Sequence, residues 1–381
     1  MLAPTNPSVV RVTALALAIT SFGPGCSRGR ERDRSAASSV NAGESSVRMV
    51  GRLEGLHSPE SVKYDPEQDV YFISNMYGYG SAKDGNGYIV RAKAADMSSP
   101  VVFVQGGRNG VTLDAPKGIT LHGDTLWVTD IDVLRAFDRH TGAPLGTIDF
   151  RPNGAVLLND VTVGADGSLY VTDTGILMTD KGVLHPGGDK IFVVGPNRAI
   201  SVMASGNALG RPNGIAWDSA GRRVIVVSFD PFDSRVYAFR AGDTTRTMLA
   251  KGLGKFDGIE LLPGGRMLVT SWADSSVHLF SGQSDVKLVR DLWQPADLGL
   301  DTRRNRVAVP VGVRESGSSC GRCLPWRRNS PGVGKLRTGA YPKPDSALPP
   351  ARLSCVHDRK VMNDRRVEHG DRVSGARRTS R

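Results

Sequence analysis

Arg211-Pro212-Asn213-Gly214-Ile215-Ala216-Trp217-Asp218 is followed by a polar turn over 219–223 and then by Val224-Ile225-Val226-Val227-Ser228. An alternating apolar stretch, a glycine-containing turn and a β-branched run predict two antiparallel strands joined by a tight reversal. Alone, Pro212-Asn213-Gly214 indicates only a turn.

The same pattern occurs six times along the chain, at spacings of about 40 to 57 residues. The other copies begin at Pro59, Pro116, Leu158, Phe256 and Pro295. A period of this length, built from short strands, is typical of a β-propeller. Residues 51–310 contain no long helical period. The sequence therefore predicts an all-β, six-bladed β-propeller over residues 46–310, with Ser46–Leu53 as the strand that closes the ring.

The net charge of +11 comes from the two ends of the chain. Residues 311–381 hold 16 Lys/Arg and 6 Asp/Glu, whereas residues 51–310 hold 27 and 29. Because the repeats are nearly neutral, we expect no nucleic-acid partner for the propeller. The four cysteines, Cys26, Cys320, Cys323 and Cys355, lie outside the repeats, so we expect neither disulfide nor thiolate ligand in the core.

The N-terminus has the features of an export signal over residues 1–26. An apolar run over 12–22 follows Arg11 and is too short to span a bilayer. Cys26 follows small residues, as at a bacterial lipoprotein cleavage site, although Gly23 stands where leucine is usual. We expect an exported protein, either secreted or held in the periplasm or cell envelope by lipidation of Cys26. The only membrane contact expected is this lipid anchor. Residues 27–45 predict a flexible linker.

Two loops are longer than usual connections, at 75–87 and 173–190. Both follow the second strand of a repeat. In a propeller that strand ends on the face where the first strand begins, so we expect both loops to overhang the mouth of the central channel. Long loops at such a mouth are suited to binding ligands.

One position at the start of each first strand predicts a metal site. Glu60, Lys117, Asn159, Asn213, Asp257 and Ala296, with Asp297 beside it, occupy this position in the six repeats. Glu60, Asn159, Asn213 and Asp257 offer only oxygen to a cation, and such ligands suit Ca²⁺, Mg²⁺ or Mn²⁺. Each Asn or Asp taken singly is also typical of a turn, but four oxygen-bearing residues at one repeat position favour a shared ligand set.

These motifs resemble the senescence marker protein/gluconolactonase/luciferin-regenerating family of six-bladed propellers. The resemblance covers residues 52–310 and depends on Pro59-Glu60, Leu158-Asn159-Asp160, Arg211–Gly214, Phe256-Asp257-Gly258 and Pro295–Gly299. It implies that Glu60, Asn159, Asn213 and Asp257 hold a catalytic divalent cation. Ca²⁺ is the expected ion, with Mg²⁺, Mn²⁺ and Zn²⁺ as alternatives. The motifs specify the fold and metal site more closely than the substrate.

The resulting hypothesis is a metal-dependent hydrolase that opens a small-molecule lactone or related ester. The cation polarises the carbonyl and positions water, and Asp257 doubles as the base. Lys117 is expected to bind a carboxylate or oxyanion, or else to pair with Glu60 or Asp297. Asp297 and His185 are further candidates for binding substrate. Asp130 and Asp173 end second strands and either bind substrate or cap turns, and we favour the turn caps. The alternative is a non-catalytic exported propeller that binds a small ligand or protein partner.

The repeat pattern stops after Val309-Pro310. Residues 311–381 form a basic, irregular tail, which we interpret either as disordered or as the product of a frameshift. The last blade is then expected to be incomplete.

Overall fold

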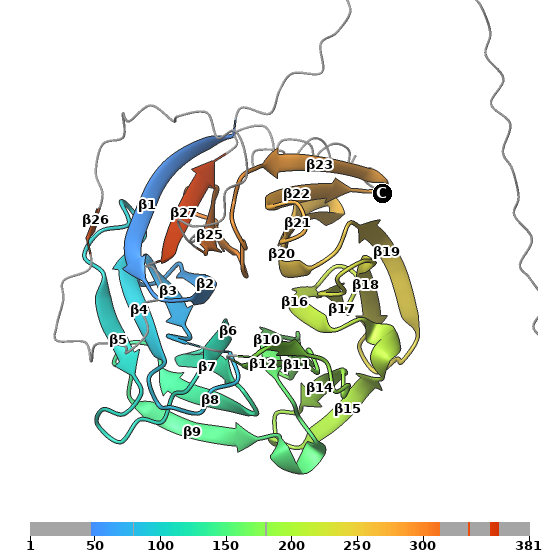
Figure 1. The fold of residues 1–381 in the computed structure, drawn as a ribbon, viewed down its shortest axis with the longest axis horizontal. Coiled ribbons are helices and arrows are strands. Elements are labelled where there is room, and N and C mark those ends of the chain that lie inside the picture. Colours follow the sequence, from blue (N-terminus) through green and yellow to red (C-terminus); the bar gives the residue numbers. More distant parts are fainter. Residues whose placement is uncertain (1–46, 79, 180, 313–333, 336–350, 358–381) are drawn as a thin grey trace, which may run out of the picture. The chain divides into compact units, whose positions relative to one another are not determined.

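The computed structural model describes residues 47–78, 80–179, 181–312, 334–335 and 351–357. In these residues, antiparallel sheets stand as six blades around a common centre (Figure 1). The prediction of an all-β, six-bladed propeller is confirmed. Among the described residues, no helix has the length and apolarity needed to cross a membrane.

Five blades have four strands each, and in each blade the first strand lies innermost (Figure 1). The first blade is β2 (Pro59–Asp65), β3 (Val70–Asn75), β4 (Tyr88–Lys93) and β5 (Val101–Gln105). The second is β6 (Pro116–His122), β7 (Thr125–Asp130), β8 (Val133–Asp138) and β9 (Pro144–Asp149). The third is β10 (Leu158–Val163), β11 (Leu169–Asp173), β14 (Lys190–Val194) and β15 (Ile200–Ser205).

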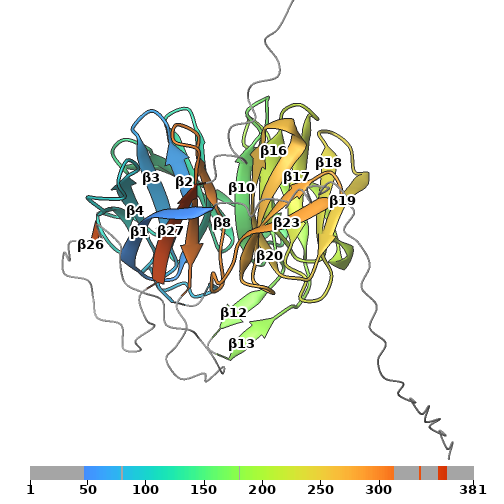
Figure 2. The ribbon, with the colours of Figure 1, turned by 90° about the horizontal axis from the view of Figure 1, so that it is seen from above.

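The fourth blade is β16 (Pro212–Asp218), β17 (Arg223–Ser228), β18 (Ser234–Arg240) and β19 (Arg246–Gly252). The fifth is β20 (Phe256–Leu262), β21 (Arg266–Ser271), β22 (Ser276–Ser281) and β23 (Ser284–Val289). Short 3-10 turns lie at Arg151–Asn153, Asn207–Leu209 and Pro263–Gly265. A separate hairpin of β12 (Leu177–Thr179) and β13 (Gly182–Leu184) projects from one face (Figure 2).

The core is divided among the contacts between neighbouring blades. Val224 and Val226 of β17 pack between the third and fourth blades, whereas Ile225 and Val227 pack between the fourth and fifth. A strand alternates its side chains between two faces, and both faces of a blade are covered. This explains why β17 is a continuous β-branched run instead of an apolar–polar alternation.

The closing blade joins the two ends of the propeller. It comprises β24 (Gly299–Asp301), β25 (Arg306–Val311), β27 (Ala351–His357) and β1 (Arg48–Leu56) in that order, and β26 (Gly334–Lys335) pairs along β1. The N-terminal closing strand was predicted. However, the predicted boundary at 310 and the incomplete last blade are wrong, because β27 pairs with both β25 and β1.

β27 corrects two predictions, that residues 311–381 are irregular throughout and that all four cysteines lie outside the repeats. Leu353 and Cys355 are buried against the first blade, and Val356 is buried against the fifth. β27 is thus part of the hydrophobic core. The expected signal, linker and lipidation site, together with Cys320 and Cys323, lie outside the described residues.

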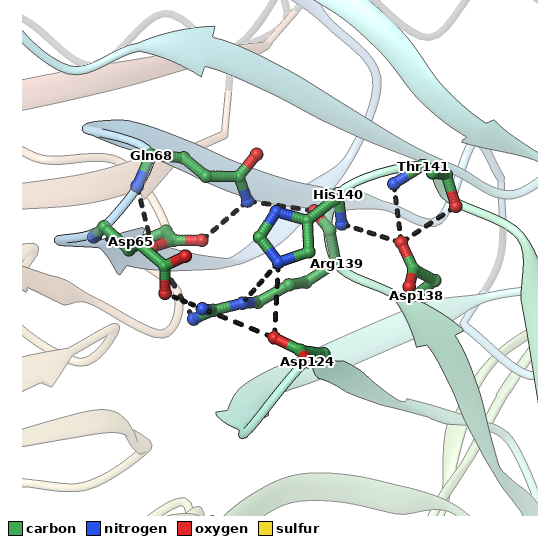
Figure 3. Close-up of polar contacts among 8 residues, drawn as sticks. Asp65, Gln68, Asp124, Asp138, Arg139, His140 and Thr141 are labelled. Carbon is green, nitrogen blue, oxygen red and sulfur yellow. Dashed lines mark hydrogen bonds and ion pairs between the residues drawn. The ribbon is translucent and has the colours of Figure 1, made fainter.

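Polar side chains connect the first two blades beside the β2–β3 turn (Figure 3). The Nε2 of Gln68 donates to Asp65 Oδ2 at 2.8 Å and to the carbonyl of Arg139 at 3.0 Å. The Arg139 side chain forms ion pairs with Asp65, Glu67 and Asp124. This turn is at the opposite end of β2 from the channel mouth, so these contacts stabilise the ring away from the candidate site.

Candidate functional site

A β-bulge at the start of the first strand positions the candidate residues. In β2, Pro59 pairs with Asn75 but Val62 pairs with Ile73, so one extra residue is accommodated between them. The same shift occurs in β6, β10, β16 and β20. In the closing blade, Pro295 bridges Val311 while Gly299 pairs with Ala308. A bulge re-aims the side chains of the residues it contains.

The bulges define two tiers of residues along the channel. The first tier, nearer the mouth, is Glu60, Lys117, Asn159, Asn213, Asp257 and Ala296. The second tier, one residue further along each strand, is Ser61, Gly118, Asp160, Gly214, Gly258 and Asp297. Glu60 is half-buried, and the other first-tier side chains are buried. The predicted metal-ligating residues therefore occupy equivalent positions in four blades.

Glycines in the second tier allow the innermost strands to approach closely. A Cβ at Gly118 would lie 2.3 Å from Asp160 Oδ1 of the third blade. A Cβ at Gly214 would lie 2.4 Å from the Asp257 carbonyl oxygen, and one at Gly258 2.5 Å from the Asp297 Cα. The glycines after Asn213 and after Asp257 therefore serve contact between blades, and both lie inside a strand and not in a turn.

Hydroxyl side chains on the second strands fix the main chain of the first tier. Ser74 Oγ accepts the Ser61 N–H at 3.0 Å and donates to the Lys117 carbonyl at 2.6 Å. Thr129 donates to the Asn159 carbonyl, and Thr172 to the Asn213 carbonyl, both at 2.5 Å. The sequence analysis missed this network. Its sequence signal is a Ser or Thr just before the last residue of the second strand, in Ser74-Asn75, Thr129-Asp130, Thr172-Asp173 and Thr270-Ser271.

Two oxygens of the first tier are buried without a hydrogen-bond partner, Asn213 Oδ1 and Asp257 Oδ1. A buried acceptor without a partner costs roughly 1–3 kcal/mol, and more when charged. Because both atoms are oxygens on neighbouring blades, a hard cation between them would satisfy both. The donor set therefore fits the predicted cation. Among the described residues, no group of three or more His, Cys, Asp or Glu could hold a metal, and the predicted set contains only two such residues.

The carboxyl groups of the first tier are held in an environment that disfavours their charge. Burial raises the pKa of Asp257 well above its usual value, and the charges of Glu60 and Asp297 raise it further. Burial also raises the pKa of Glu60, while the nearby positive charge of Lys117 opposes this shift. A bound cation would favour the charged form of both groups.

Lys117 is completely buried beneath the loop that follows β3. Its Nζ donates to the carbonyls of Gly80 at 2.8 Å and Ala115 at 3.0 Å. Among the described residues, it forms no salt bridge with Glu60 or Asp297, the partners that were considered for it. Burial lowers the pKa of Lys117 to about 8, although the charges of Glu60 and Asp130 oppose the shift.

The second tier is polar and internally paired. Ser61 Oγ donates to Asp297 Oδ2 at 2.5 Å. Asp297, a candidate for binding substrate, is therefore paired in the second tier, one residue deeper than the first. Asp160 accepts the N–H of Ile215 at 2.8 Å, and burial raises its pKa to about 6. Further along the strands, Lys63 and Glu260 form a salt bridge of 3.0 Å. These contacts place paired charges at the end of the tiers away from the mouth.

The two long loops contact each other above the first tier. The Ser81 N–H donates to the Met178 carbonyl at 3.3 Å, and the Met178 N–H donates to Ser81 Oγ at 2.9 Å. Because Gly80 accepts a hydrogen bond from Lys117, the joined loops lie over the first tier. The predicted overhang of the channel mouth therefore agrees with the structure.

The remaining candidates are held by loop contacts. Asp173 accepts the N–H groups of Val156 and Leu157, and Asp130 accepts those of Asp114 and Ala115. Both act as caps of the preceding loop, as interpreted from the sequence. The Nε2 of His185 lies 2.6 Å from Asp189 Oδ1, so its contact is with its own loop and not with the first tier.

A six-bladed propeller with oxygen-bearing side chains at the channel mouth defines a class of propeller proteins with a central polar site. The SMP-30/Gluconolactonase/LRE-like region matches residues 59–295, which is more than half of the chain. The chain therefore belongs to this family. A search of curated proteins found no match.

Solved structures with this fold include relatives of low sequence identity. A luciferin-regenerating enzyme is 13% identical with a TM-score of 0.58, over 83% of this chain and 96% of that chain. A gluconolactonase from Xanthomonas campestris is 16% identical with a TM-score of 0.53, over 70% and 86%. A putative gluconolactonase is 17% identical with a TM-score of 0.51, over 70% and 88%. These likenesses show the fold, and family membership supports a lactonase-type function.

Proposed function

We propose that this chain is a hydrolase that opens a lactone or related ester and depends on a divalent cation. Ca²⁺ is the expected ion, with Mg²⁺, Mn²⁺ and Zn²⁺ as alternatives. The observation that carries this proposal is the pair of buried, unpartnered oxygens, Asn213 Oδ1 and Asp257 Oδ1, at equivalent positions of adjacent blades. Family membership supports the hydrolase assignment.

The chain supplies ligands that balance the charge of such an ion. Glu60 and Asp257 contribute two carboxylates, and Asn159 and Asn213 contribute neutral amide oxygens that add no repulsion. When bound, the cation supplies Lewis acidity toward the substrate carbonyl and the attacking water. The bulges and the hydroxyl network hold the main chain of these four residues, so the ligands are pre-organised.

Asp257 is the proposed base. Burial raises the pKa of Asp257, and a bound cation would hold the carboxyl group in the charged form that accepts a proton. It removes a proton from water as the water oxygen bonds to the carbonyl carbon. The ring C–O bond then breaks, and the proton returns from Asp257 to the leaving alkoxide. These steps oxidise and reduce no group.

Lys117 is the proposed donor to the developing oxyanion. An ammonium group has three N–H donors, and the carbonyls of Gly80 and Ala115 accept from Nζ. The third N–H remains for a substrate oxygen. Since both carbonyls belong to the wall of the mouth, Lys117 is held in place before substrate binds.

The test is lactone hydrolysis by the purified protein before and after treatment with a chelator. We expect hydrolysis of one or more members of a lactone and ester panel, loss of at least 90% of the rate on chelation, and recovery when Ca²⁺ is added. Hydrolysis that is unaffected by chelation would contradict the metal dependence. Cation binding without hydrolysis of any member would instead favour the non-catalytic propeller.

A further inference from the structure

Apolar side chains lie at the channel mouth, directly after the second strand, in four of the first five blades. Where a second strand ends, the next residue is Met76 in the first blade, Ile131 in the second, Phe229 in the fourth and Trp272 in the fifth. Thr174 follows β11 in the third blade, and its hydroxyl donates to the Pro212 carbonyl at 3.1 Å. This polar side chain is therefore already paired.

The side of the mouth formed by the first three blades is an aliphatic and thioether surface. One apolar cluster contains the buried residues Ala115, Ile131, Leu157 and Ile176, with Met76 and Met178 packed against it. Its location beside the first tier follows from Gly80, whose carbonyl binds Lys117. A Cβ on Gly80 would lie 3.0 Å from the sulfur of Met178 and 3.3 Å from that of Met76.

The side of the mouth formed by the fourth and fifth blades is aromatic. The backbone N–H of Phe229 donates to the Arg211 carbonyl, and the backbone N–H of Trp272 donates to the Lys255 carbonyl. Phe229 therefore lies beside the start of β16, and Trp272 lies beside the start of β20. Their rings contact edge to face at 5.0 Å. The indole nitrogen of Trp272 is buried without a hydrogen-bond partner, and its proximity to Asp257 lowers the pKa of that carboxyl group.

The groups at the other end of the tiers are polar and paired with one another. Ser61 and Asp297 are paired in the second tier, and Lys63 and Glu260 are paired beyond it. A ligand that enters at the mouth and reaches Asn213 and Asp257 passes the apolar side chains described above. The Met76, Met178 and Phe229 side chains offer a polyhydroxylated ring no hydrogen bonds to replace those that it would lose to water, which costs affinity.

We propose that the substrate carries an apolar substituent: it is an alkyl- or aryl-substituted lactone or ester, and not a polyhydroxylated lactone. This inference rests on the proposed hydrolase function and assigns its substrate class. The partly exposed residues Met76, Met178, Phe229 and Trp272 form the surface that receives the substituent, and Ile131 and Leu157 are buried beneath it.

Two measurements test the proposal. The first is kcat/KM for γ-lactones with side chains from none to pentyl, compared with glucono-δ-lactone. Burial of one methylene group raises kcat/KM by about threefold to fourfold. We expect that gain per methylene, and at least a 100-fold lower kcat/KM for glucono-δ-lactone than for the pentyl lactone. The second is calorimetric binding of the matching 5-alkyl-2-pyrrolidinones, lactams that resist hydrolysis, with the same expected gain in affinity.

The Met178→Gln variant introduces a polar side chain of similar length. We expect its gain per methylene to fall below twofold in both measurements. The control is Met248→Gln, which changes a methionine that is 42% exposed on the outer strand β19. This variant should show the same gain per methylene as the wild type in both measurements.

The outcomes separate the two proposals. Hydrolysis with no chain-length gain, or with preference for glucono-δ-lactone, overturns the substrate class and leaves the hydrolase function. Graded lactam binding without any hydrolysis overturns the hydrolase function but supports apolar recognition. Lactam binding that does not depend on chain length, or no binding at all, overturns the inference.

Discussion

Lys117 places a positive charge in the same tier as the proposed cation ligands. It is completely buried, and its nearest hydrogen-bond acceptors are carbonyls and not a carboxylate. A fixed ammonium group beside Glu60 repels a second cation. In the proposed function, Lys117 would therefore lower the affinity of the site for a cation while it donates a hydrogen bond to the substrate.

We predict that Lys117→Met tightens Ca²⁺ binding by about tenfold, or about 1.4 kcal/mol, because the change removes this repulsion. Hydrolysis should fall at the same time, because the donor to the oxyanion is lost. Calcium titration of the chelated variant measures the first effect. Lys190→Met is a matched control, since Lys190 Nζ also donates to two carbonyls, those of Gly154 and Gly188. Equal or weaker binding by Lys117→Met would refute the proposed repulsion.

At the residue scale, the sequence predicted which side chains share a position but not how they are held. Glu60, Asn159, Asn213 and Asp257 were recognisable because strand starts repeat along the chain. The contact of Lys117 with Gly80 was not, because it depends on how a 13-residue loop folds back over the channel. His185 was a plausible candidate from its loop, but only the fold gives it Asp189 as partner.

In each of the first three blades, a hydroxyl group on the second strand donates a hydrogen bond to the first tier of the next blade. Thr172 of β11 accepts the Asp160 N–H at 3.0 Å and donates to the Asn213 carbonyl at 2.5 Å. One hydroxyl group thus joins the bulge of its own blade to a proposed ligand residue of the next. In the fourth blade, Val227 stands at the equivalent position, so the backbone also accepts a β-branched apolar side chain there.

We predict that Thr172→Val lowers the free energy of unfolding by about 2 kcal/mol, because the change leaves a buried N–H and a buried carbonyl without this partner. Valine has the same shape as threonine, so packing is retained. Denaturant unfolding of the chelated protein measures the loss. The control is Thr247→Val on the exposed face of β19, which should change stability by less than about 0.5 kcal/mol. If the two variants are equally stable, the hydroxyl network does not stabilise the ring.

At the element scale, the strands were predictable because their apolar runs end in Gly, Pro, Asn and Asp turns. The bulges were not. A bulge adds one residue to one strand without a distinct composition, and it is recognised only when the partner strand is in place.

The ring as a whole is closed by strands from both ends of the propeller. β1 was predictable from its alternation and position. β27 was not, because about 40 residues without a periodic pattern separate it from β25. Its identity as a core strand depends on tertiary pairing with β25 and β1, which local sequence does not encode. Its apolar side chains pack on both sides of the closing blade, Leu353 and Cys355 against the first blade and Val356 against the fifth.

A cation bound by Glu60, Asn159, Asn213 and Asp257 would tie together four blades that are far apart in sequence. This cation site is the central claim, and calorimetric titration of Ca²⁺ into the chelated protein tests it most directly. We predict one site per chain, with Asn213→Ala and Asp257→Asn each weakening binding at least tenfold. Asp243→Asn, in the exposed β18–β19 turn, should bind as the wild type does. Absence of binding by the wild type, or unchanged affinity in both first-tier variants, would contradict the site.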